Sequence, residues 1–122
     1  MKIKLSQLPL QKVTITSGFW QKKMTINRTR TLPIQYEQLK KTGRLDALKL
    51  KWRDGMPNKP HIFWDSDIGK WIEAAAYSLS QFHDQRLERK VDTVVKMIEK
   101  AQMQDGYFNS HFQSCGIDGR WK

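Results

Sequence analysis

The chain has 122 residues, enough for one modest domain, and its 39% apolar and 28% charged residues place it in the globular range and outside that of disordered proteins. Its formal charge of +10 is dispersed over several segments, which favours a solvated basic surface over a nucleic-acid site. The single cysteine, Cys115, excludes an internal disulfide and a multi-cysteine metal site built from this chain alone.

The N-terminus lacks the features of a targeting or membrane segment. Residues 1–6 contain no apolar run of the length that a signal peptide needs, and no stretch approaches the ~20 apolar residues of a membrane span. We therefore expect a cytoplasmic protein that does not enter a membrane.

Two elements are expected in the first third of the chain. Residues 5–17 alternate imperfectly between apolar and polar, with β-branched residues at 13–16, so residues 1–17 predict an extended lead-in or edge strand. Residues 18–43 predict a helical segment that is kinked or restarted before Pro33, because proline lacks an amide donor, and that ends at Gly43. Trp20 falls on the apolar face of this helix and is expected in the core.

Residues 44–64 predict a long loop, since they contain Gly55, Pro57 and Pro60 and show no sustained periodicity beyond a possible short turn at Leu45 to Leu50. Loops of this length in a compact domain are more often functional than accidental. The loop leads directly into the clearest helical pattern of the chain.

Residues 65–105 predict a helix hairpin, because apolar residues recur at three- and four-residue spacing on both sides of a short turn at His83-Asp84. Asp65, Ser66 and Asp67 are expected to cap the first of the two helices, and Trp71 is expected in its core face. Residues 106–122 are aromatic and contain glycine, and they predict an irregular tail. The sequence as a whole thus predicts an all-α chain of helix pairs.

Three residues at the exit of the loop are candidates for binding. Trp64 stands immediately before the predicted helix, where loops that lead into rigid elements concentrate binding residues. Asp65 and Asp67 follow it and could be read as a catalytic carboxylate pair, although helix capping is the simpler interpretation. A general acid and a nucleophile need carboxyl groups ~5 Å or more apart across the scissile bond, which adjacent helix-start residues do not establish.

Other residue types give weaker signals. His61, His83 and His111 show no zinc-type spacing, so we expect no metal site within this chain. Cys115 has no activating neighbour in sequence and is expected to be an inert thiol. Nucleic-acid binding is a poor match, because the hairpin carries mixed charge and no compact basic recognition helix.

Seven sequence segments stand out when they are taken in order: Gly18-Phe19-Trp20, Asn27 to Arg30, Pro33 to Leu39, Thr42 to Asp46, Phe63-Trp64-Asp65-Ser66-Asp67, Lys70 to Leu79, and Ala101-Gln102 with Asp105 to Asn109. Together they resemble glycoside hydrolase family 127, the β-L-arabinofuranosidase family that was formerly a domain of unknown function. The match extends from about Val13 to Trp121. Each phrase is modest alone, and their succession is specific.

The resemblance implies an (α/α)6 toroid, of which this chain would be an incomplete N-terminal portion. It implies that Gln35, Trp64, Asp65 and Asp67 line the pocket for an L-arabinofuranoside-type carbohydrate, with Tyr107 as a weaker candidate. The family's cysteine nucleophile, its zinc ligands and its glutamate acid/base lie beyond residue 122. Cys115 does not match the nucleophile, so this chain is expected to hold no catalytic or metal-binding residue and no cofactor.

Trp121-Lys122 falls where the family's chain would enter its next helix, so we expect a truncated gene, a fragment or a split-gene product that is inactive alone. An alternative is a non-enzymatic helical interaction module, whose exposed faces pair with a second copy or with a C-terminal partner chain. A basic nucleic-acid binder is the third and weakest possibility.

Overall fold

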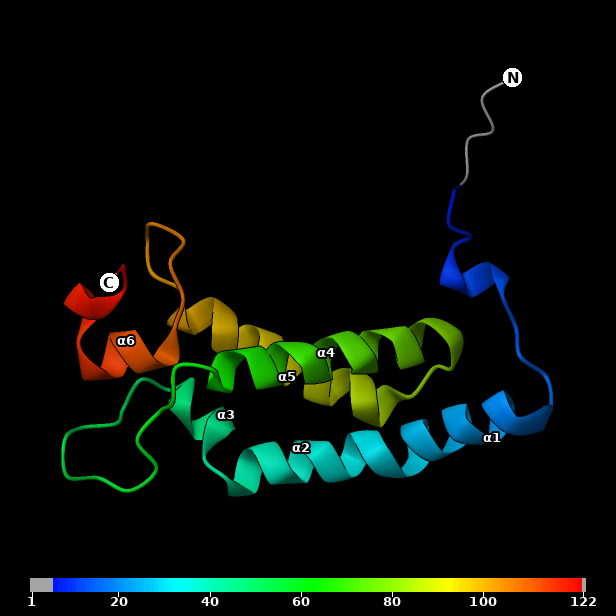
Figure 1. The fold of residues 1–122 in the computed structure, drawn as a ribbon, viewed down its shortest axis with the longest axis horizontal. Coiled ribbons are helices and arrows are strands. Elements are labelled where there is room, and N and C mark those ends of the chain that lie inside the picture. Colours follow the sequence, from blue (N-terminus) through cyan, green and yellow to red (C-terminus); the bar gives the residue numbers. More distant parts are fainter. Residues whose placement is uncertain (1–5, 122) are drawn as a thin grey trace.

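The computed structural model describes residues 6–121, which form helices joined by loops (Figure 1). No strand occurs in that range, so the expected all-α class is confirmed. The elements, in chain order, are η1 (Leu10–Lys12), α1 (Gly18–Ile26), η2 (Asn27–Thr31), α2 (Leu32–Lys41), α3 (Arg44–Ala47), α4 (Trp64–Gln81), α5 (Gln85–Ala101), α6 (Ser110–Cys115) and η3 (Ile117–Gly119). Within the same range, no helix combines the length and the apolar character needed to cross a membrane.

The lead-in is irregular over the part that the structure describes. Residues 6–17 contain the short 3-10 turn η1, and their side chains are exposed. Pro9 precedes this turn with a φ of −57° and has no amide hydrogen for a strand ladder. Gln81 of α4 contacts this lead-in: its Nε2 donates hydrogen bonds to the carbonyls of Leu10 and Val13 at 3.4 and 3.2 Å. The expected edge strand is therefore absent from residues 6–17, and residues 1–5 lie outside the described part.

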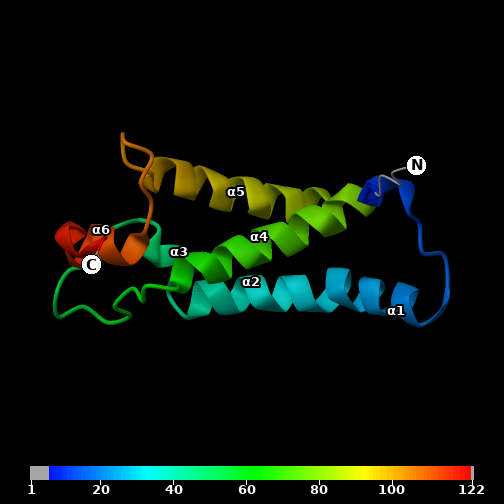
Figure 2. The same ribbon diagram turned by 45° about the horizontal axis from the view of Figure 1, so that its top comes forward.

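A long helical stretch from Gly18 to Lys41 changes its winding in the middle (Figure 2). Residues 27–31 form the π-helical segment η2, after which the N–H of Leu32 bonds to the carbonyl of Asn27, five residues back. Pro33 follows and has no amide hydrogen for the helical ladder, so a widened turn accommodates its ring. The expected interruption before Pro33 is thus a π-helical segment.

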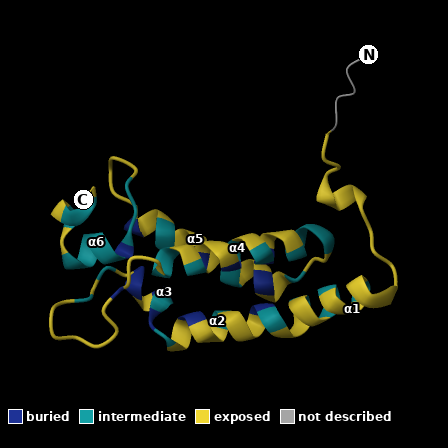
Figure 3. Ribbon diagram, in the orientation of Figure 1, coloured by how far each residue is buried: buried dark blue, intermediate teal, exposed yellow. Residues whose placement is uncertain are grey.

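α1 contributes little to the core. None of its residues is buried, and Figure 3 shows it largely exposed. Phe19 and Trp20 are 62% and 65% exposed and pack edge to face, with ring centroids 5.0 Å apart. The expectation that Trp20 lies in the core is therefore wrong, whereas Trp71, which is 3% exposed, lies there as expected.

The segment predicted as a loop contains the short helix α3. Leu45, Ala47 and Leu48 are buried there against α2 and α4, and residues 48–63 then run without a regular helix. A helix of four residues is too short to give a periodic signal, and its burial depends on partners distant in sequence. The prediction of a loop over 44–64 is corrected accordingly, since the possible short turn at Leu45 to Leu50 is the helix α3 and the turn after it.

α4 begins at Trp64, with Phe63 as its N-cap and no side-chain cap. Ser66 donates its Oγ–H back to the carbonyl of Phe63 at 2.8 Å, and both aspartates contact other elements. The expectation that Asp65, Ser66 or Asp67 caps this helix is therefore wrong. The two carboxylates still place negative charge in the first turn, where the helix dipole favours it.

α4 lies between α2 and α5 and forms the expected hairpin with α5 (Figure 2). Asp84 caps α5, because its Oδ1 accepts from the N–H groups of Arg86 and Leu87 at 2.9 and 3.1 Å. α5 ends at Ala101, before the expected Asp105. The core between these helices consists mainly of Leu32 and Leu39 from α2, Ile68, Trp71 and Ala75 from α4, and Leu87 and Val94 from α5.

The C-terminal segment is more regular than the predicted tail. Residues 110–115 form α6, which Asn109 caps by accepting from the N–H of Phe112 at 3.1 Å. Gln113 ties α6 to the end of α5, since its Nε2 donates to the carbonyl of Ala101 at 2.7 Å. The prediction of an irregular tail over 106–122 is corrected, because side-chain contacts stabilise a helix too short to predict from periodicity.

Candidate functional site

A groove of about 360 Å³ lies between α2 and α4. It is lined by Ile34, Gln35, Gln38 and Leu39 from α2 and by Asp67, Lys70, Trp71 and Ala74 from α4. Its walls thus combine apolar side chains with carboxamide, carboxylate and ammonium groups. A mostly apolar concavity with a few polar groups is typical of a site for a small polar ligand.

α2 presents two glutamines to this groove. Gln35 and Gln38 lie about one helical turn apart and are both exposed, so their carboxamides are accessible to a ligand. A carboxamide both donates and accepts hydrogen bonds, as hydroxyl groups do. The structure therefore places Gln35, predicted from the sequence, beside a second glutamine that the sequence analysis did not select.

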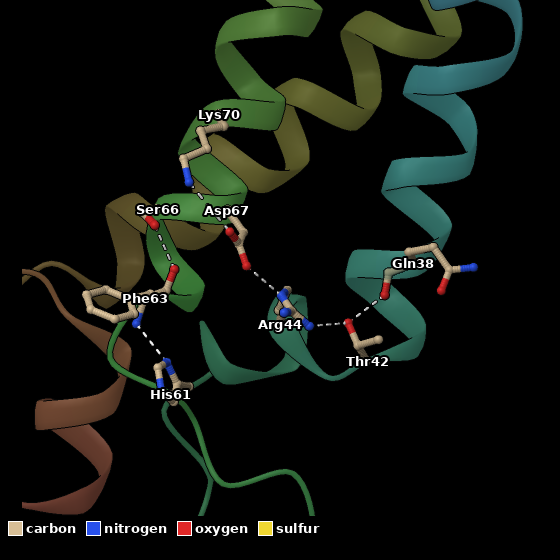
Figure 4. Close-up of polar contacts among 8 residues, drawn as sticks. All are labelled: Gln38, Thr42, Arg44, His61, Phe63, Ser66, Asp67 and Lys70. Carbon is tan, nitrogen blue, oxygen red and sulfur yellow. Dashed lines mark hydrogen bonds and ion pairs between the residues drawn. The ribbon is translucent and has the colours of Figure 1, made fainter.

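Two cations hold Asp67 at the edge of the groove (Figure 4). Arg44 of α3 donates its Nε–H to Asp67 Oδ2 at 2.9 Å, and the Lys70 Nζ lies 3.8 Å from Asp67 Oδ1. The guanidinium also donates from Nη1 to the Thr42 Oγ1 at 2.8 Å. Asp67 thus links α3 to α4 through Oδ2. Among residues 6–121, the Lys70 ammonium at 3.8 Å is the only polar partner of Oδ1.

Trp64 lies one turn before Asp67 on α4 and is half-buried. The Arg44 guanidinium carbon stands 5.1 Å from the centroid of its ring, so a cation covers one face of the indole. Trp52 and Trp71 donate their indole N–H groups to backbone carbonyls, whereas that of Trp64 has no acceptor within residues 6–121. The indole N–H of Trp64 is therefore available as a donor to a ligand.

Asp65 points away from these residues and toward α6. Its Oδ2 accepts from the backbone N–H of Ser110 at 2.6 Å, while its Oδ1 and the Ser110 Oγ are buried without a partner in the described part. Asp65 is absent from the groove lining. The structure thus separates Asp65 from Asp67, although they share one turn of α4.

Tyr107 lies in the C-terminal segment and not in the groove. Its ring packs against Trp121, with centroids 5.5 Å apart, and the guanidinium of Arg120 stands 5.2 Å from its centroid. Its carbonyl accepts from the N–H of Met103 at 2.8 Å. Of the sequence-predicted residues, Gln35 and Asp67 line one groove. Trp64 does not line it and is linked to Asp67 through Arg44, and Asp65 and Tyr107 lie apart.

The histidines and the cysteine form no cluster. His61 accepts from the N–H of Phe63 through Nδ1 at 3.3 Å, and the His111 Nδ1 lies 2.7 Å from the carbonyl of Pro60. Cys115 is a free, half-buried thiol at the end of α6. Within residues 6–121, no three His, Cys, Asp or Glu side chains come close enough to hold a metal ion. The zinc implied by the family resemblance therefore does not fit the residues described in this chain.

Sequence reasoning missed Arg44, Gln38 and Lys70. A signal for two of them existed, because Gln38 and Lys70 stand three residues after Gln35 and Asp67, the spacing that places side chains on one helix face. Arg44 follows the helix-ending Gly43 and gave no such signal. Its contact with Asp67 spans 23 residues and depends on the packing of α3 against α4.

Comparison with known proteins agrees with this architecture. Residues 12–122 match the family described as β-L-arabinofuranosidase, GH127 catalytic domain. The non-reducing end β-L-arabinofuranosidase of Bifidobacterium longum subsp. longum is 31% identical over an alignment of 121 residues, which covers 83% of this chain and 18% of that protein.

A solved GH127 β-arabinofuranosidase has the same fold over the shared part, with a TM-score of 0.78 and 29% sequence identity. The superposition covers 87% of this chain and 17% of the solved chain. This chain therefore spans less than a fifth of the length of these relatives. With a family match over residues 12–122, the chain belongs to glycoside hydrolase family 127.

Proposed function

We propose that this chain forms one wall of the sugar-binding site of a β-L-arabinofuranosidase-like glycoside hydrolase and has no catalytic activity alone. The observation that carries the proposal is the α2–α4 groove, which Gln35 and Asp67 both line, together with Arg44, which contacts both Asp67 and Trp64. The family match and the names of both relatives support an L-arabinofuranoside-type carbohydrate as the ligand.

The groups around the groove suit a furanose ring. Gln35 can donate to one hydroxyl group and accept from another, and Asp67 Oδ1 can accept from a third. The uncovered face of Trp64 can pack against the C–H groups of the sugar while its indole N–H donates to an oxygen. Hydroxyl recognition and an aromatic platform are thus both available within two adjacent helices.

The same geometry argues against catalysis by the two aspartates. A glycosidase that uses two carboxyl groups places them on opposite sides of the scissile bond, ~5 Å or more apart. Asp65 is bonded to the backbone of α6, and Asp67 to the guanidinium of Arg44. In the proposed function both are structural or binding groups. The nucleophile, the zinc and the acid/base that the resemblance implies are proposed to come from other parts of such an enzyme.

The surface of α1 favours a second candidate function, that of an interaction module. Phe19 and Trp20 are more than half exposed on a helix with no buried residue, and adjoining exposed aromatic side chains are typical of a surface that another polypeptide covers. Analytical ultracentrifugation of the wild type and of F19S/W20S tests self-association. A concentration-dependent dimer that the double variant abolishes would support it, and a wild-type monomer at every concentration would contradict it.

Titration of the ¹⁵N-labelled chain with methyl β-L-arabinofuranoside tests the leading proposal. We expect weak binding, on the order of millimolar, that shifts the signals of α2 and α4, and no such shifts with methyl β-D-glucopyranoside. Gln35→Ala should weaken this binding, whereas Gln11→Ala, at an exposed glutamine of the lead-in, should not. If the arabinofuranoside shifts no signal of the chain, the binding role is contradicted.

Incubation with p-nitrophenyl β-L-arabinofuranoside, with and without added zinc, tests the claim of inactivity. We expect no release of nitrophenol above the buffer rate in either case. Zinc-dependent turnover by the purified chain would contradict that claim while leaving the sugar-binding role intact.

A further inference from the structure

Arg44 occupies the point where α2, α3 and α4 meet. Gly43 precedes it in a left-handed conformation, with a φ of +82°, and a Cβ there would lie 3.1 Å from the Asn58 Cβ. This tight turn lets the chain pass from α2 into α3 and brings the first side chain of α3 to the start of α4 (Figure 4). The position of Arg44 is thus fixed by a backbone geometry that favours glycine.

The guanidinium makes directional contacts on two sides. On one side Nε donates to Asp67 Oδ2 at 2.9 Å. On the other, Nη1 donates to the Thr42 Oγ1 at 2.8 Å, and that hydroxyl in turn donates to the carbonyl of Gln38 at 2.6 Å. A planar guanidinium holds its N–H donors in a rigid fork and can donate to both acceptors at once. The lysine ammonium is a point charge on a flexible stem and lacks this fixed arrangement of donors. Arg44 therefore connects the end of α2 to the first turn of α4.

The same guanidinium lies over the ring of Trp64, which stands three residues before Asp67 on α4. The Arg44 side chain is 27% exposed, so its interactions are less screened by water than those of a fully exposed ion pair. One arginine thus contacts both the aromatic ring and the carboxylate that the proposed function assigns to the sugar.

We propose that Arg44 is a positioning residue of the sugar site: it orients the ring of Trp64 and the carboxylate of Asp67 toward the α2–α4 groove. Its guanidinium covers one face of Trp64 and leaves the other to the sugar, and it holds Asp67 Oδ2 so that Oδ1 remains for a hydroxyl group. This inference rests on the proposed function, because it assigns Trp64 and Asp67 to sugar binding.

The apolar core that joins these helices does not include the guanidinium of Arg44. The core that joins α2, α3 and α4 is apolar and includes Leu39, Leu45, Ile68 and Trp71, all 8% exposed or less. Replacement of Arg44 should therefore leave these helices packed and change the orientation of the two site residues. That separation makes a positioning role measurable.

The experiment compares the indole N–H signals of ¹⁵N-labelled wild type, Arg44→Lys and Arg44→Met. Trp64→Phe assigns the signal of Trp64 by its loss. The backbone amide signal of Val94 reports on the core, because Val94 is fully buried in the core cluster and does not line the groove. Lys49→Met is the matched control, since it breaks the exposed 2.7 Å pair with Asp46 just after α3. Each protein is then titrated with methyl β-L-arabinofuranoside.

We expect both Arg44 variants to move the Trp64 signal, to leave that of Val94 in place, and to weaken sugar binding roughly tenfold, as misplaced binding groups do. Lys49→Met should match the wild type in all three readouts. Unchanged Trp64 signal and sugar affinity in Arg44→Met would overturn the inference. A displaced Val94 signal would overturn it too, because the arginine would then support the core.

Failure of the proposed function gives a different result. If the sugar moves no signal of the wild type, the sugar-binding role is contradicted, and the positioning role in that site falls with it. If the wild type binds the sugar and Arg44→Met binds it equally well, the proposed function stands and only the role of Arg44 is contradicted.

Discussion

Asp65 on α4 accepts a hydrogen bond of 2.6 Å from the backbone N–H of Ser110, the first residue of α6 and 45 positions later in the chain. The first N–H groups of a helix have no partner within the helix, and a carboxylate is a strong acceptor for them. Ser110 is fully buried, so water does not replace this bond. The carboxylate predicted to cap its own helix thus caps a different one.

We predict that Asp65→Ala lowers the free energy of unfolding by about 1–3 kcal/mol, the usual cost of removing a charged acceptor from a buried donor. Asp65→Asn keeps a neutral acceptor and should cost less. Thermal unfolding measures both, and hydrogen exchange at the Ser110 amide should accelerate in the alanine variant.

Asp118→Ala is the control for this prediction, because Asp118 is an exposed aspartate of η3. It should unfold at the wild-type temperature. If Asp65→Ala unfolded there as well, the bond to Ser110 would not contribute to stability.

Alanine substitutions at two glycines should change the stability of the chain in opposite directions. Gly43→Ala should destabilise the chain by about 1–2 kcal/mol, because Gly43 has a φ of +82° and its new Cβ would press on Asn58. Gly69→Ala should instead stabilise it by about 0.5–1 kcal/mol, since Gly69 lies inside α4 and a Cβ there meets nothing within 4 Å. In urea unfolding, the midpoint of Gly43→Ala should lie below that of the wild type, and the midpoint of Gly69→Ala above it. Equal shifts would contradict the two backbone conformations.

Trp71 tests the contact between α4 and α2. Trp71 is 3% exposed, and its ring centroid lies 5.1 Å from that of Tyr36. Its indole N–H donates to the carbonyl of Leu32. Trp71→Phe removes the bond and part of the buried volume, so we expect a loss of about 2 kcal/mol. Trp121→Phe, at a ring that is 78% exposed, should change the unfolding temperature little.

The sequence predicted the parts of the fold that depend on local pattern. α4 and α5 have 18 and 17 residues, long enough for apolar periodicity to show, and Gly43 ends a helix where its left-handed conformation is needed. The resemblance named Gln35 and Asp67, which line one groove, and Trp64, which is linked to Asp67 through Arg44. Their role in sugar binding remains a prediction.

The parts that the sequence did not predict depend on contacts between distant segments. α3 and α6 have four and six residues, and their stability comes from burial and from side chains of other elements. Asp65 and Asp67 look equivalent in sequence, yet one bonds to Ser110 and the other to Arg44. Trp20 shows the converse, because a helical apolar face predicts burial, yet the described chain leaves this side chain 65% exposed.

The indole of Trp64 offers a graded test of sugar recognition. Trp64→Phe keeps an aromatic face beside Arg44 but removes the N–H donor, so it should weaken binding of methyl β-L-arabinofuranoside by about 1 kcal/mol, or roughly fivefold. Trp64→Ala removes both features and should weaken binding further, because the stacking surface is lost as well.

Neither Trp64 variant should unfold the chain, since Trp64 is half-buried and outside the core cluster, and circular dichroism should confirm the helical content. Trp121→Phe, at the exposed C-terminal ring, should bind the sugar as the wild type does. Equal affinity of Trp64→Phe and the wild type would mean that the indole N–H does not contact the sugar. Equal affinity of Trp64→Ala would remove Trp64 from the binding site, because both the ring and its donor are then gone.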